Sequence, residues 1–517
     1  MNLRQILLSV GLLVLVIGLA MLSALGVGVC LHDSRMAIHG LTVSTAACLL
    51  CSLACISLSC LCNRDAAGAS PLRDGFISVV LSWIAAVFFG AMPFVLCCRF
   101  RPMDALFETA SGFSTTGASV IEAGMPLLEG GTLARGLESL PQSLLFWRSM
   151  LNWLGGIGFV MFVLMLLPAL GGGKQLYNAE VPGLKSANDQ LTPRIATTAR
   201  LMLGCYVLWT VAVVLAYRYL GMGDFFEAVC HAFATVATGG FSTHTESFGH
   251  FASPVLQWAA TLAMFFSACN FMLMINLFRH AVFGYHKDEE FRTFLFLAVA
   301  CTLVFAFQLH RRACVGAAYT TGAPLPDRLE PLLRTSAFQV VSMMSTTGFA
   351  TSDYMAWGLP GLPTLILFLM ICGGCGGSTA GGLKLARLIV VVKQSLGEVR
   401  RRVFPHLMPN VTLNRARIEM PVVHQTMAFA VIYVATIIVG TVLLPYLSAM
   451  DFDTAFSATV SAVSNVGPGL GKVGPSYTYV WMSVPAKALL AFIMIAGRLE
   501  LYTVFIVFMP SFWHAKR

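Results

Sequence analysis

Four short polar segments interrupt an otherwise apolar chain, and each is rich in small or hydroxyl residues around one glycine. The first lies in FSTTGAS at residues 113–119. The others lie in DFFEAVCHAFATVATGGFST (224–243), LLRTSAFQVVSMMSTTGFAT (332–351) and DFDTAFSATVSAVSNVGPGLG (451–471). The predicted central glycines are Gly117, Gly239, Gly348 and Gly467. Glycine and threonine are weak helix formers. We therefore expect extended backbone, whose carbonyl oxygens can replace the water around a cation.

The chain around these segments has the composition of a membrane protein. Of its 517 residues, 57% are hydrophobic and 11% are charged. Apolar runs of about 18 residues can cross roughly 30 Å of hydrocarbon. Such runs cover residues 6–30, 41–62, 76–97, 145–167, 201–220, 255–278, 294–309, 427–447 and 481–509. The sequence predicts an all-α polytopic membrane protein and excludes one large soluble core.

Each polar segment follows a helical stretch of about 10–14 residues, which is too short to span a membrane. Three stretches have an aspartate at the expected N-cap, namely Asp104, Asp224 and Asp453, and the third stretch has Thr335 and Ser336 instead. The repeated unit is a span, a short re-entrant helix, a polar segment and a second span. Such a unit crosses the membrane twice, so four successive units are parallel and can surround one axis.

The predicted boundaries follow from these repeats. An N-terminal pair of transmembrane helices covers residues 1–70, and the four units cover residues 71–175, 190–285, 290–398 and 418–517. Non-helical backbone at membrane depth is tolerated where protein buries it or where it lines a water-filled path. Four such segments around an axis favour a cation pathway. The alternative is close helix packing through small residues, which one segment alone would favour.

From about residue 76 onwards the chain resembles the TrkH/TrkG/KtrB superfamily of potassium transporters. The resemblance is carried by STTGAS, ATGGFSTH, STTGFAT, SNVGPGLG, GGCGGSTAGGLK and GRLE. The two additional N-terminal spans are similar to the TrkH branch. The resemblance implies K⁺ as the transported ion, a homodimer, and a TrkA-like cytoplasmic partner that binds nucleotides. It also implies a bacterial inner membrane location.

The resemblance further implies that backbone next to each glycine contacts K⁺. Carried over by motif, these positions with their glycines are Thr115, Thr116, Gly117, Ala237, Thr238, Gly239, Thr346, Thr347, Gly348, Asn465, Val466 and Gly467. The segments are not equivalent, because the second has Ala237 and the fourth has Asn465 and Val466 where the others have hydroxyl residues. The strictness of selection for K⁺ over Na⁺ therefore stays open.

A second glycine-rich stretch interrupts residues 362–392, which are too many for one straight crossing. We expect a broken helix whose central loop lies beneath the polar segments and acts as a gate, as in the family. The alternative is close helix packing. The candidate gate residues are Gly373, Gly374, Gly376, Gly377, Ser378, Thr379, Gly381, Gly382, Lys384 and Arg498.

Two cations and one histidine in apolar surroundings are further candidates. Lys384 is a functional candidate at membrane depth, or it extends toward the cytoplasm. Arg498 matches a family arginine below the filter, where it would slow or order cations, and its alternative role is an ion pair with Glu500. His231 is expected to form packing or hydrogen-bonding contacts rather than to bind a metal, because no partner ligand has suitable spacing.

The formal net charge of +9 is unevenly distributed. Basic clusters between the spans place both termini in the cytoplasm by the positive-inside rule, although Arg311, Arg312, Arg328 and Arg334 fall on an expected outer loop. Residues 171–194 and 393–417 are the predicted docking surfaces for the regulatory partner, and bilayer orientation explains their charge equally well. Nucleic acid is not an expected partner.

Motifs of soluble chemistry are missing from the sequence. Neither glycine-lysine stretch has the spacing of a phosphate-binding loop, so no organic cofactor and no enzymatic activity are expected. The predicted function is passive, gated K⁺ conduction through the translocating subunit of a Trk-type system. The alternative is a secondary transporter that couples K⁺ to Na⁺ or H⁺. It is less favoured because such folds bury acidic relays and few carboxylates are expected deep in this chain.

Overall fold

The computed structural model describes residues 2–62, 71–156, 158, 195–280, 285–314, 328–359, 361–405, 411–414 and 416–514. The described chain is predominantly helical, which confirms the predicted fold class. Six described helices are long and apolar enough to cross a membrane, and they cover Leu3–Cys30, Arg35–Leu61, Arg73–Cys98, Arg200–Leu220, Glu289–Arg312 and Met420–Leu447. Large apolar side chains such as Leu50, Phe88 and Phe296 are exposed on their outer faces, as lipid-facing surfaces require.

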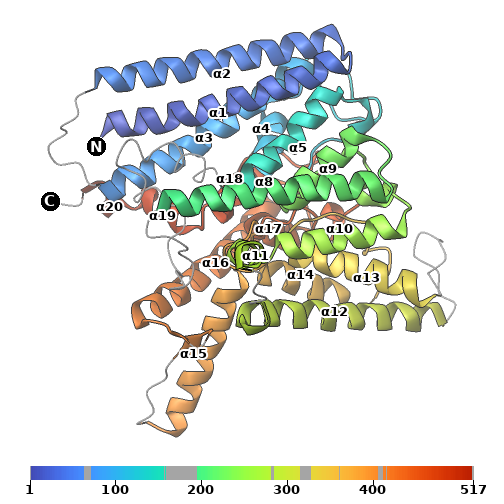
Figure 1. Ribbon diagram of the computed structural model, residues 1–517, viewed down its shortest axis with the longest axis vertical. Coiled ribbons are helices and arrows are strands. Elements are labelled where there is room, and N and C mark those ends of the chain that lie inside the picture. The colour runs from blue at the N-terminus through green and yellow to red at the C-terminus, as the bar shows by residue number, and fades with distance from the viewer. Residues whose placement is uncertain are drawn as a thin grey trace.

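The first two helices form an antiparallel pair at one edge of the molecule (Figure 1). They are α1 (Leu3–Cys30) and α2 (Arg35–Leu61). Gly40 brings α2 against the backbone of α3, where an added Cβ would lie 2.8 Å from Leu96. The pair therefore packs beside the first unit.

Four units follow this pair along the chain. The first unit contains α3 (Pro71–Cys98), α4 (Pro102–Phe113) and α5 (Gln142–Gly156). The second contains α8 (Ile195–Leu220), α9 (Phe225–Val236), α10 (Pro254–Ser267) and α11 (Phe271–His280). The third contains α12 (Glu289–Cys314), α13 (Leu329–Met344), α14 (Leu362–Cys372) and α15 (Leu385–Val403). The fourth contains α16 (Met420–Leu447), α17 (Phe452–Ser464), α18 (Val484–Arg498) and α19 (Tyr502–Phe508).

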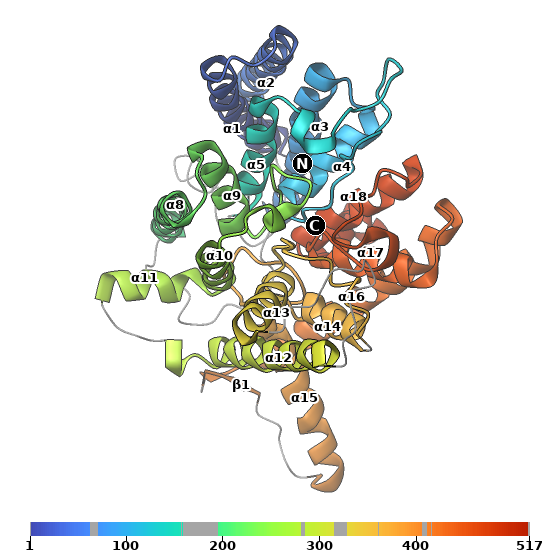
Figure 2. The ribbon, with the colours of Figure 1, turned by 90° about the vertical axis from the view of Figure 1, so that its right-hand side faces the viewer.

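The units are arranged in a ring. Figure 2 shows them around a common centre in chain order, from blue through green and yellow to red. The helix after each polar segment packs against the short helix of the next unit, in the pairs α5 with α9, α10 with α13, α14 with α17, and α18 with α4. The last pair closes the ring between the end and the beginning of the chain.

Several boundaries differ from the sequence-based expectation. The predicted span 255–278 is divided into α10 and α11, and the span 481–509 bends by 117° between α18 and α19. Asp224 caps α9 by accepting from the amide of Phe226, but Asp104 and Asp453 lie in the first turns of their helices, whose N-cap residues are Arg101 and Asp451.

The third short helix, α13, is also longer than expected, with 16 residues. Its N-cap is Arg328, so Thr335 and Ser336 lie within the helix instead of at its start. Asp104 lies in the first turn of α4, where its carboxylate accepts from Lys487 Nζ at 2.6 Å.

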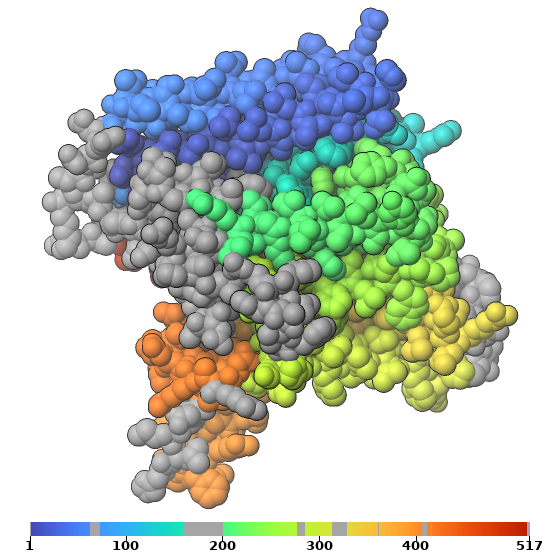
Figure 3. Space-filling view, in the orientation of Figure 1, coloured from blue at the N-terminus to red at the C-terminus, as the bar shows by residue number. Residues whose placement is uncertain are grey.

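The helix α15 extends away from the bundle, as the orange projection in Figure 3 shows. Its last turn carries Arg400, Arg401 and Arg402. A short antiparallel hairpin of β1 (Thr412–Leu413) and β2 (Ala416–Arg417) follows it. The other predicted basic surface, residues 171–194, lies outside the described residues.

Candidate functional site

The four polar segments adopt the same backbone course at the ends of α4, α9, α13 and α17. In each, one residue in the left-handed region follows the short helix: Thr115, Thr238, Thr346 and Asn465, with φ of 53–56°. Two residues later comes a glycine with φ of 69–101°: Gly117, Gly240, Gly348 and Gly467. The repeated conformation shows that the segments are structural equivalents despite their different sequences.

The register of the second segment differs by one residue from the predicted register. Gly240, not Gly239, has the positive φ of the central glycine, and Gly239 takes the place of Thr116. Ala237 is accordingly the C-cap of α9. The sequence left this undetermined because two consecutive glycines can both adopt the required conformation.

The four glycines lie directly against carbonyl groups of the neighbouring segments. A Cβ added to Gly117 would lie 2.5 Å from the carbonyl oxygen of Gly239, and one added to Gly240 would meet that of Thr347. Gly348 faces the carbonyl oxygen of Val466 in the same way, and Gly467 faces that of Thr116. Each segment thus presents a carbonyl to its neighbour's glycine, and the four contacts form a closed ring.

Local hydrogen bonds fix the direction of each segment. The amides of Thr116, Gly239, Thr347 and Val466 all donate back to a carbonyl five residues earlier in the short helix, at 2.8–3.0 Å. The side chain of Asn465 turns sideways and donates to Met494 O at 2.8 Å and to Thr116 Oγ1 at 3.1 Å. Backbone rather than side-chain groups therefore define the ring.

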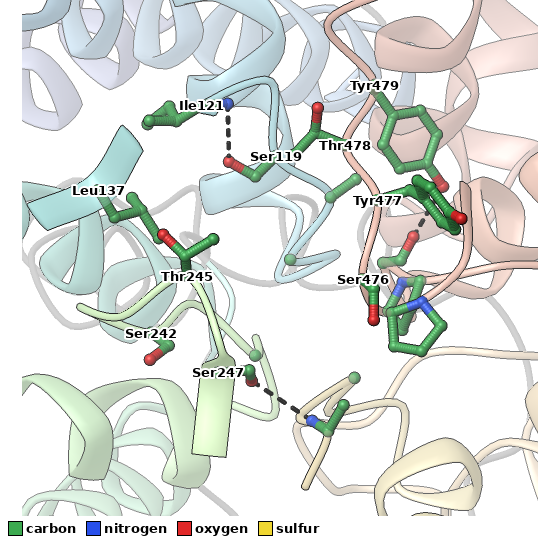
Figure 4. A pocket seen from close by; sticks show the side chains of 18 of the residues that line it. Ser119, Ile121, Leu137, Ser242, Thr245, Ser247, Ser476, Tyr477, Thr478 and Tyr479 are labelled. Carbon is green, nitrogen blue, oxygen red and sulfur yellow. Dashed lines mark hydrogen bonds between the residues drawn. The ribbon is translucent and has the colours of Figure 1, made fainter. Parts of the chain in front are cut away.

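Above the ring lies a pocket to which all four units contribute (Figure 4). Its lining includes the four positive-φ glycines and the side chains of Ser242, Thr245 and Tyr479. At its rim, Glu138 accepts from the amide and hydroxyl of Thr245 at 2.8 and 2.7 Å. Partial burial raises the pKa of Glu138, but these bonds outweigh it and hold the pKa below its ordinary value. The rim therefore keeps a negative charge.

Below the ring, the chain between α14 and α15 forms a glycine-rich loop without helical structure. The amide of Gly381 donates to Thr346 Oγ1 at 2.7 Å. Thr379 Oγ1 is within hydrogen-bond distance of the carbonyl of Val236 at 3.0 Å and of Ser267 at 3.2 Å. A Cβ on Gly381 would clash with the carbonyl oxygen of Ser464. The loop thus contacts the inner ends of the second, third and fourth units, and the broken-helix prediction is confirmed.

Arg498 links this loop to the first unit. Its guanidinium donates to Thr379 O at 2.7 Å, and to the carbonyls of Gly155 and Gly156 at 2.6 and 2.8 Å. The alternative pairing of Arg498 with Glu500 is wrong. Glu500 instead pairs with Lys384 at 3.1 Å and with Arg387, because the break after α18 turns these neighbours in different directions. Lys384 therefore forms an ion pair with a buried carboxylate.

His231 is buried and forms hydrogen bonds, as expected. Its ring nitrogens lie 2.9 Å from Glu227 O and 2.9 Å from Ser242 Oγ. Among the described residues no cluster of three or more potential ligands could hold a metal ion.

The sequence-based expectation of few deep carboxylates is wrong. Glu108, Glu290 and Glu500 are buried carboxylates close to the ring or the loop, and Asp104 is buried at the outer start of α4. Glu290 accepts from the amides of Gly376 at 2.6 Å and Ala386 at 2.9 Å, on both sides of the loop. In the sequence, such buried carboxylates are indicated by an acidic residue next to or within an apolar stretch. Their partners are identified only by the fold.

Known proteins resemble this chain along nearly its whole length. A family model described as TrkH, cation transport protein, matches residues 45–515. The "Trk system potassium uptake protein TrkH" of Escherichia coli (strain K12) is 38% identical over 459 residues, which cover 87% of this chain and 88% of that protein. The protein of the same name from Vibrio parahaemolyticus serotype O3:K6 is 34% identical over 522 residues and covers 100% of both chains.

The arrangement of the helices is also known from a crystal structure. The potassium transporter TrkH from Vibrio parahaemolyticus matches with a TM-score of 0.83 and 32% sequence identity, covering 99% of this chain and 100% of that chain. The family match includes all four polar segments and the glycine-rich loop. The chain therefore belongs to the TrkH family of cation transport proteins and is a multi-pass membrane protein.

Proposed function

We propose that this protein takes up K⁺ across the membrane through the ring of four polar segments. The observation that carries the proposal is the closed set of contacts between each positive-φ glycine and the carbonyl of the next segment. Such a ring directs backbone oxygens toward one axis, where they replace the hydration shell of a cation. The curated relatives from Escherichia coli and Vibrio parahaemolyticus are both named potassium uptake proteins.

The short helices support cation binding electrostatically. Each ends at the ring, and the C-terminal end of a helix carries partial negative charge. The proposed ion-contacting residues are Thr115, Thr116, Gly117, Ala237, Thr238, Gly239, Gly240, Thr346, Thr347, Gly348, Asn465, Val466 and Gly467. Gly240 is added to the predicted set because of the corrected register. Ala237 is the C-cap of α9 and contributes only to the partial negative charge at the end of that helix.

The intramembrane loop is the proposed gate. Residues 373–384 lie at the inner ends of α9, α13 and α17. Arg498 links the loop to the end of α5 in the first unit. A chain in this position obstructs an ion that leaves the ring toward the cytoplasm. Movement of the loop would open the pathway without changing the ring itself.

The family also suggests the setting of the protein. We propose a bacterial inner membrane location with both termini in the cytoplasm, a homodimer, and a TrkA-like partner that binds nucleotide and controls the gate. The printed name "Trk system" of the relatives supports association with other components. The helix α15 directly follows the loop, and the arginines in its last turn provide a basic surface for such a partner.

Coupled transport with Na⁺ or H⁺ is less well supported than passive conduction. The buried carboxylates around the pathway are engaged: Asp104 with Lys487, Glu108 with Arg148, Glu500 with Lys384 and Arg387, and Glu290 with two amides. A proton or Na⁺ relay needs carboxylates that can change partners. Rb⁺ uptake that depends on a Na⁺ or proton gradient at fixed voltage would favour coupling.

The substitution Gly348→Ala tests the proposed function. Its Cβ would meet the carbonyl of Val466 at φ +80°, so the ring must distort. We expect the preference of Rb⁺ and K⁺ over Na⁺ and Li⁺ to fall in proteoliposome uptake assays. The control is Gly124→Ala, which has a similar φ of +84° but nothing within 4 Å of the added Cβ.

Gly124→Ala should keep the wild-type ion preference, because it introduces the same backbone strain away from the ring. An unchanged preference in a folded Gly348→Ala protein would contradict the role of the ring. So would wild-type protein that transports neither Rb⁺ nor K⁺.

A further inference from the structure

Each short helix holds the chain just after its polar segment through a buried polar side chain. In the second unit His231 bonds to Ser242 at 2.9 Å. In the third unit Gln339 donates to Ser352 O at 2.9 Å. In the fourth, Ser457 accepts from the amide of Leu470, also at 2.9 Å. We call these side chains, together with Glu108 of the first unit, the anchoring residues.

Glu108 is the acidic member of the anchoring residues. Its carboxylate accepts from the hydroxyl of Ser119 at 3.0 Å and from the amide of Val120 at 2.9 Å. The side chain is completely buried. A buried carboxylate needs a counter-ion as well as hydrogen bonds, because desolvation of an unpaired charge is costly.

Arg148 of α5 supplies this counter-ion from within the same unit. Its Nε lies 2.6 Å from Glu108 Oε1, and its side chain is 3% exposed. The two charges cancel, so the pair adds little net field at the pocket above the ring, although Arg148 contributes to the lining of that pocket. An effect of Arg148 on the ions is therefore expected to come from position rather than charge.

The guanidinium also reaches the second unit. Nη1 donates to the carbonyl of Ser242 at 2.7 Å, and the guanidinium carbon lies 3.5 Å from the centre of the Phe241 ring. Both residues follow Gly240 directly, and Ser242 is the partner of the anchoring residue His231. One cation is thus bonded directly to the chain after the second polar segment and, through Glu108, to the chain after the first.

Only an arginine side chain can make this set of contacts at once. The planar guanidinium places one donor on Glu108, a second on Ser242 and its face on Phe241, whereas a lysine offers a single nitrogen. The geometry of the first and second polar segments is therefore coupled through Arg148.

We propose that Arg148 is a positioning residue that sets the spacing between the first and second polar segments and thereby contributes to selection of K⁺ over Na⁺. This inference rests on the proposed function of the ring. A carbonyl ring discriminates ions by the number and placement of its oxygens. Loosening one of the four junctions should admit the smaller, more strongly hydrated Na⁺.

The test uses purified full-length protein in liposomes, with ⁸⁶Rb⁺ uptake measured alone and in competition with Na⁺. Arg148→Gln removes the charge and the bond to Ser242, and we expect the Rb⁺ over Na⁺ ratio to fall about tenfold, as loss of a hydrogen bond to a charged group predicts. Arg148→Lys should show a smaller decrease. The control is Arg334→Gln, an arginine bonded to Gln257 and Glu330 at the outer end of α13, which should keep the ratio.

A second variant separates positioning from charge balance. Arg148→Gln alone leaves Glu108 unpaired and can impair folding, whereas the double variant Glu108→Gln/Arg148→Gln buries no charge. We expect the double variant to fold and elute as the wild type but to keep the lowered ion ratio, because neither residue restores the bond to Ser242.

A folded double variant with the wild-type Rb⁺ over Na⁺ ratio would overturn the inference. It would show that Arg148 serves only to balance the charge of Glu108. That result would leave the proposed function intact as long as the wild type prefers Rb⁺ over Na⁺. If the wild type itself shows no preference, the ring proposal fails and the role of Arg148 fails with it.

Discussion

The residues that form the ring carry local strain that repeats four times. Thr115, Thr238 and Thr346 have φ of 53–56°, a region in which β-branched side chains are strongly disfavoured. Each such residue costs of order 1–3 kcal/mol and persists only where the surroundings determine it. Asn465 occupies the same position in the fourth segment with less strain, because asparagine tolerates this conformation. The strained residues thus lie in the four polar segments, whose carbonyl groups face the glycines of the neighbouring segments.

At the same scale, Arg498 lies between the loop and the first unit. Replacement by glutamine removes its charge and most of its bonds to Gly155, Gly156 and Thr379. Since a cation below the ring opposes the passage of K⁺ and these bonds hold the loop, we predict faster Rb⁺ uptake by Arg498→Gln in proteoliposomes. Arg498→Lys retains the charge and separates the two causes.

If Arg498→Lys is as slow as the wild type, the charge is the main barrier. If it is as fast as the glutamine variant, the geometry of the three bonds dominates. Uptake by Arg498→Gln no faster than the wild type would show that this side chain neither obstructs the pathway nor holds the loop.

At the scale of elements, breaks in the helices supply partners for the polar backbone of the loop. The break between α10 and α11 exposes the carbonyl of Ala268, which accepts from Cys375, and the amide of Phe271, which donates to Gly377 O at 3.1 Å. Unpaired backbone groups are costly at membrane depth. The polar backbone of the loop therefore needs partners, and an interruption in a neighbouring helix provides them. The division of the second unit's last span is thus linked to the loop of the third.

Glu290 at the start of α12 holds both ends of this loop. We predict that Glu290→Ala increases the basal Rb⁺ uptake, because the amides of Gly376 and Ala386 lose their shared acceptor and the loop, the proposed gate, leaves its place below the ring more often. The matched control is Glu330→Ala, a carboxylate that is 54% exposed at the outer start of α13. Uptake should rise only in the first variant.

A folded Glu290→Ala protein with wild-type uptake would show that this carboxylate supports the fold without restraining the gate. Thermal unfolding in detergent distinguishes that case from general destabilisation, which would lower uptake through loss of folded protein.

At the scale of the whole molecule, the ring must be closed between segments that lie at opposite ends of the chain. Asp104 of α4 and Lys487 of α18 are separated by 383 residues and pair at 2.6 Å, with both side chains 5% exposed. Lys487 also donates to Val480 O at 2.7 Å. This buried pair joins the first and fourth units near the outer ends of their helices.

Breaking this pair should lower stability more than removing an ion pair at the surface. For Lys487→Met we predict a loss of about 3–5 kcal/mol in the free energy of unfolding, because Asp104 remains buried without its counter-ion. The control Arg99→Ala removes a pair with Glu129 whose side chains are 42% and 64% exposed, and should cost about 0–1 kcal/mol.

Denaturant unfolding in detergent measures both variants, and Asp104→Asn/Lys487→Met should recover much of the loss. Equal losses in Lys487→Met and Arg99→Ala would contradict a closing role for the buried pair.

The sequence by itself determined the elements that follow from composition and local propensity. Apolar length indicated the long helices α1, α2, α3, α8, α12 and α16, and glycine and hydroxyl residues marked the polar segments and the loop between α14 and α15. The fourfold repetition of FSTTGAS-like stretches indicated an axis, because each unit returns the chain to the same side of the membrane. These features depend on neighbours in the chain, so a single sequence contains them.

Only the tertiary structure decided which residues meet across the ring. It assigned Gly240 rather than Gly239 to the central position, paired Glu500 with Lys384 instead of Arg498, and brought Arg148 between two polar segments. Such pairings link residues that are distant in sequence, and a buried charge takes whichever counter-ion the packing places beside it. Distance along the chain carries no information about that choice.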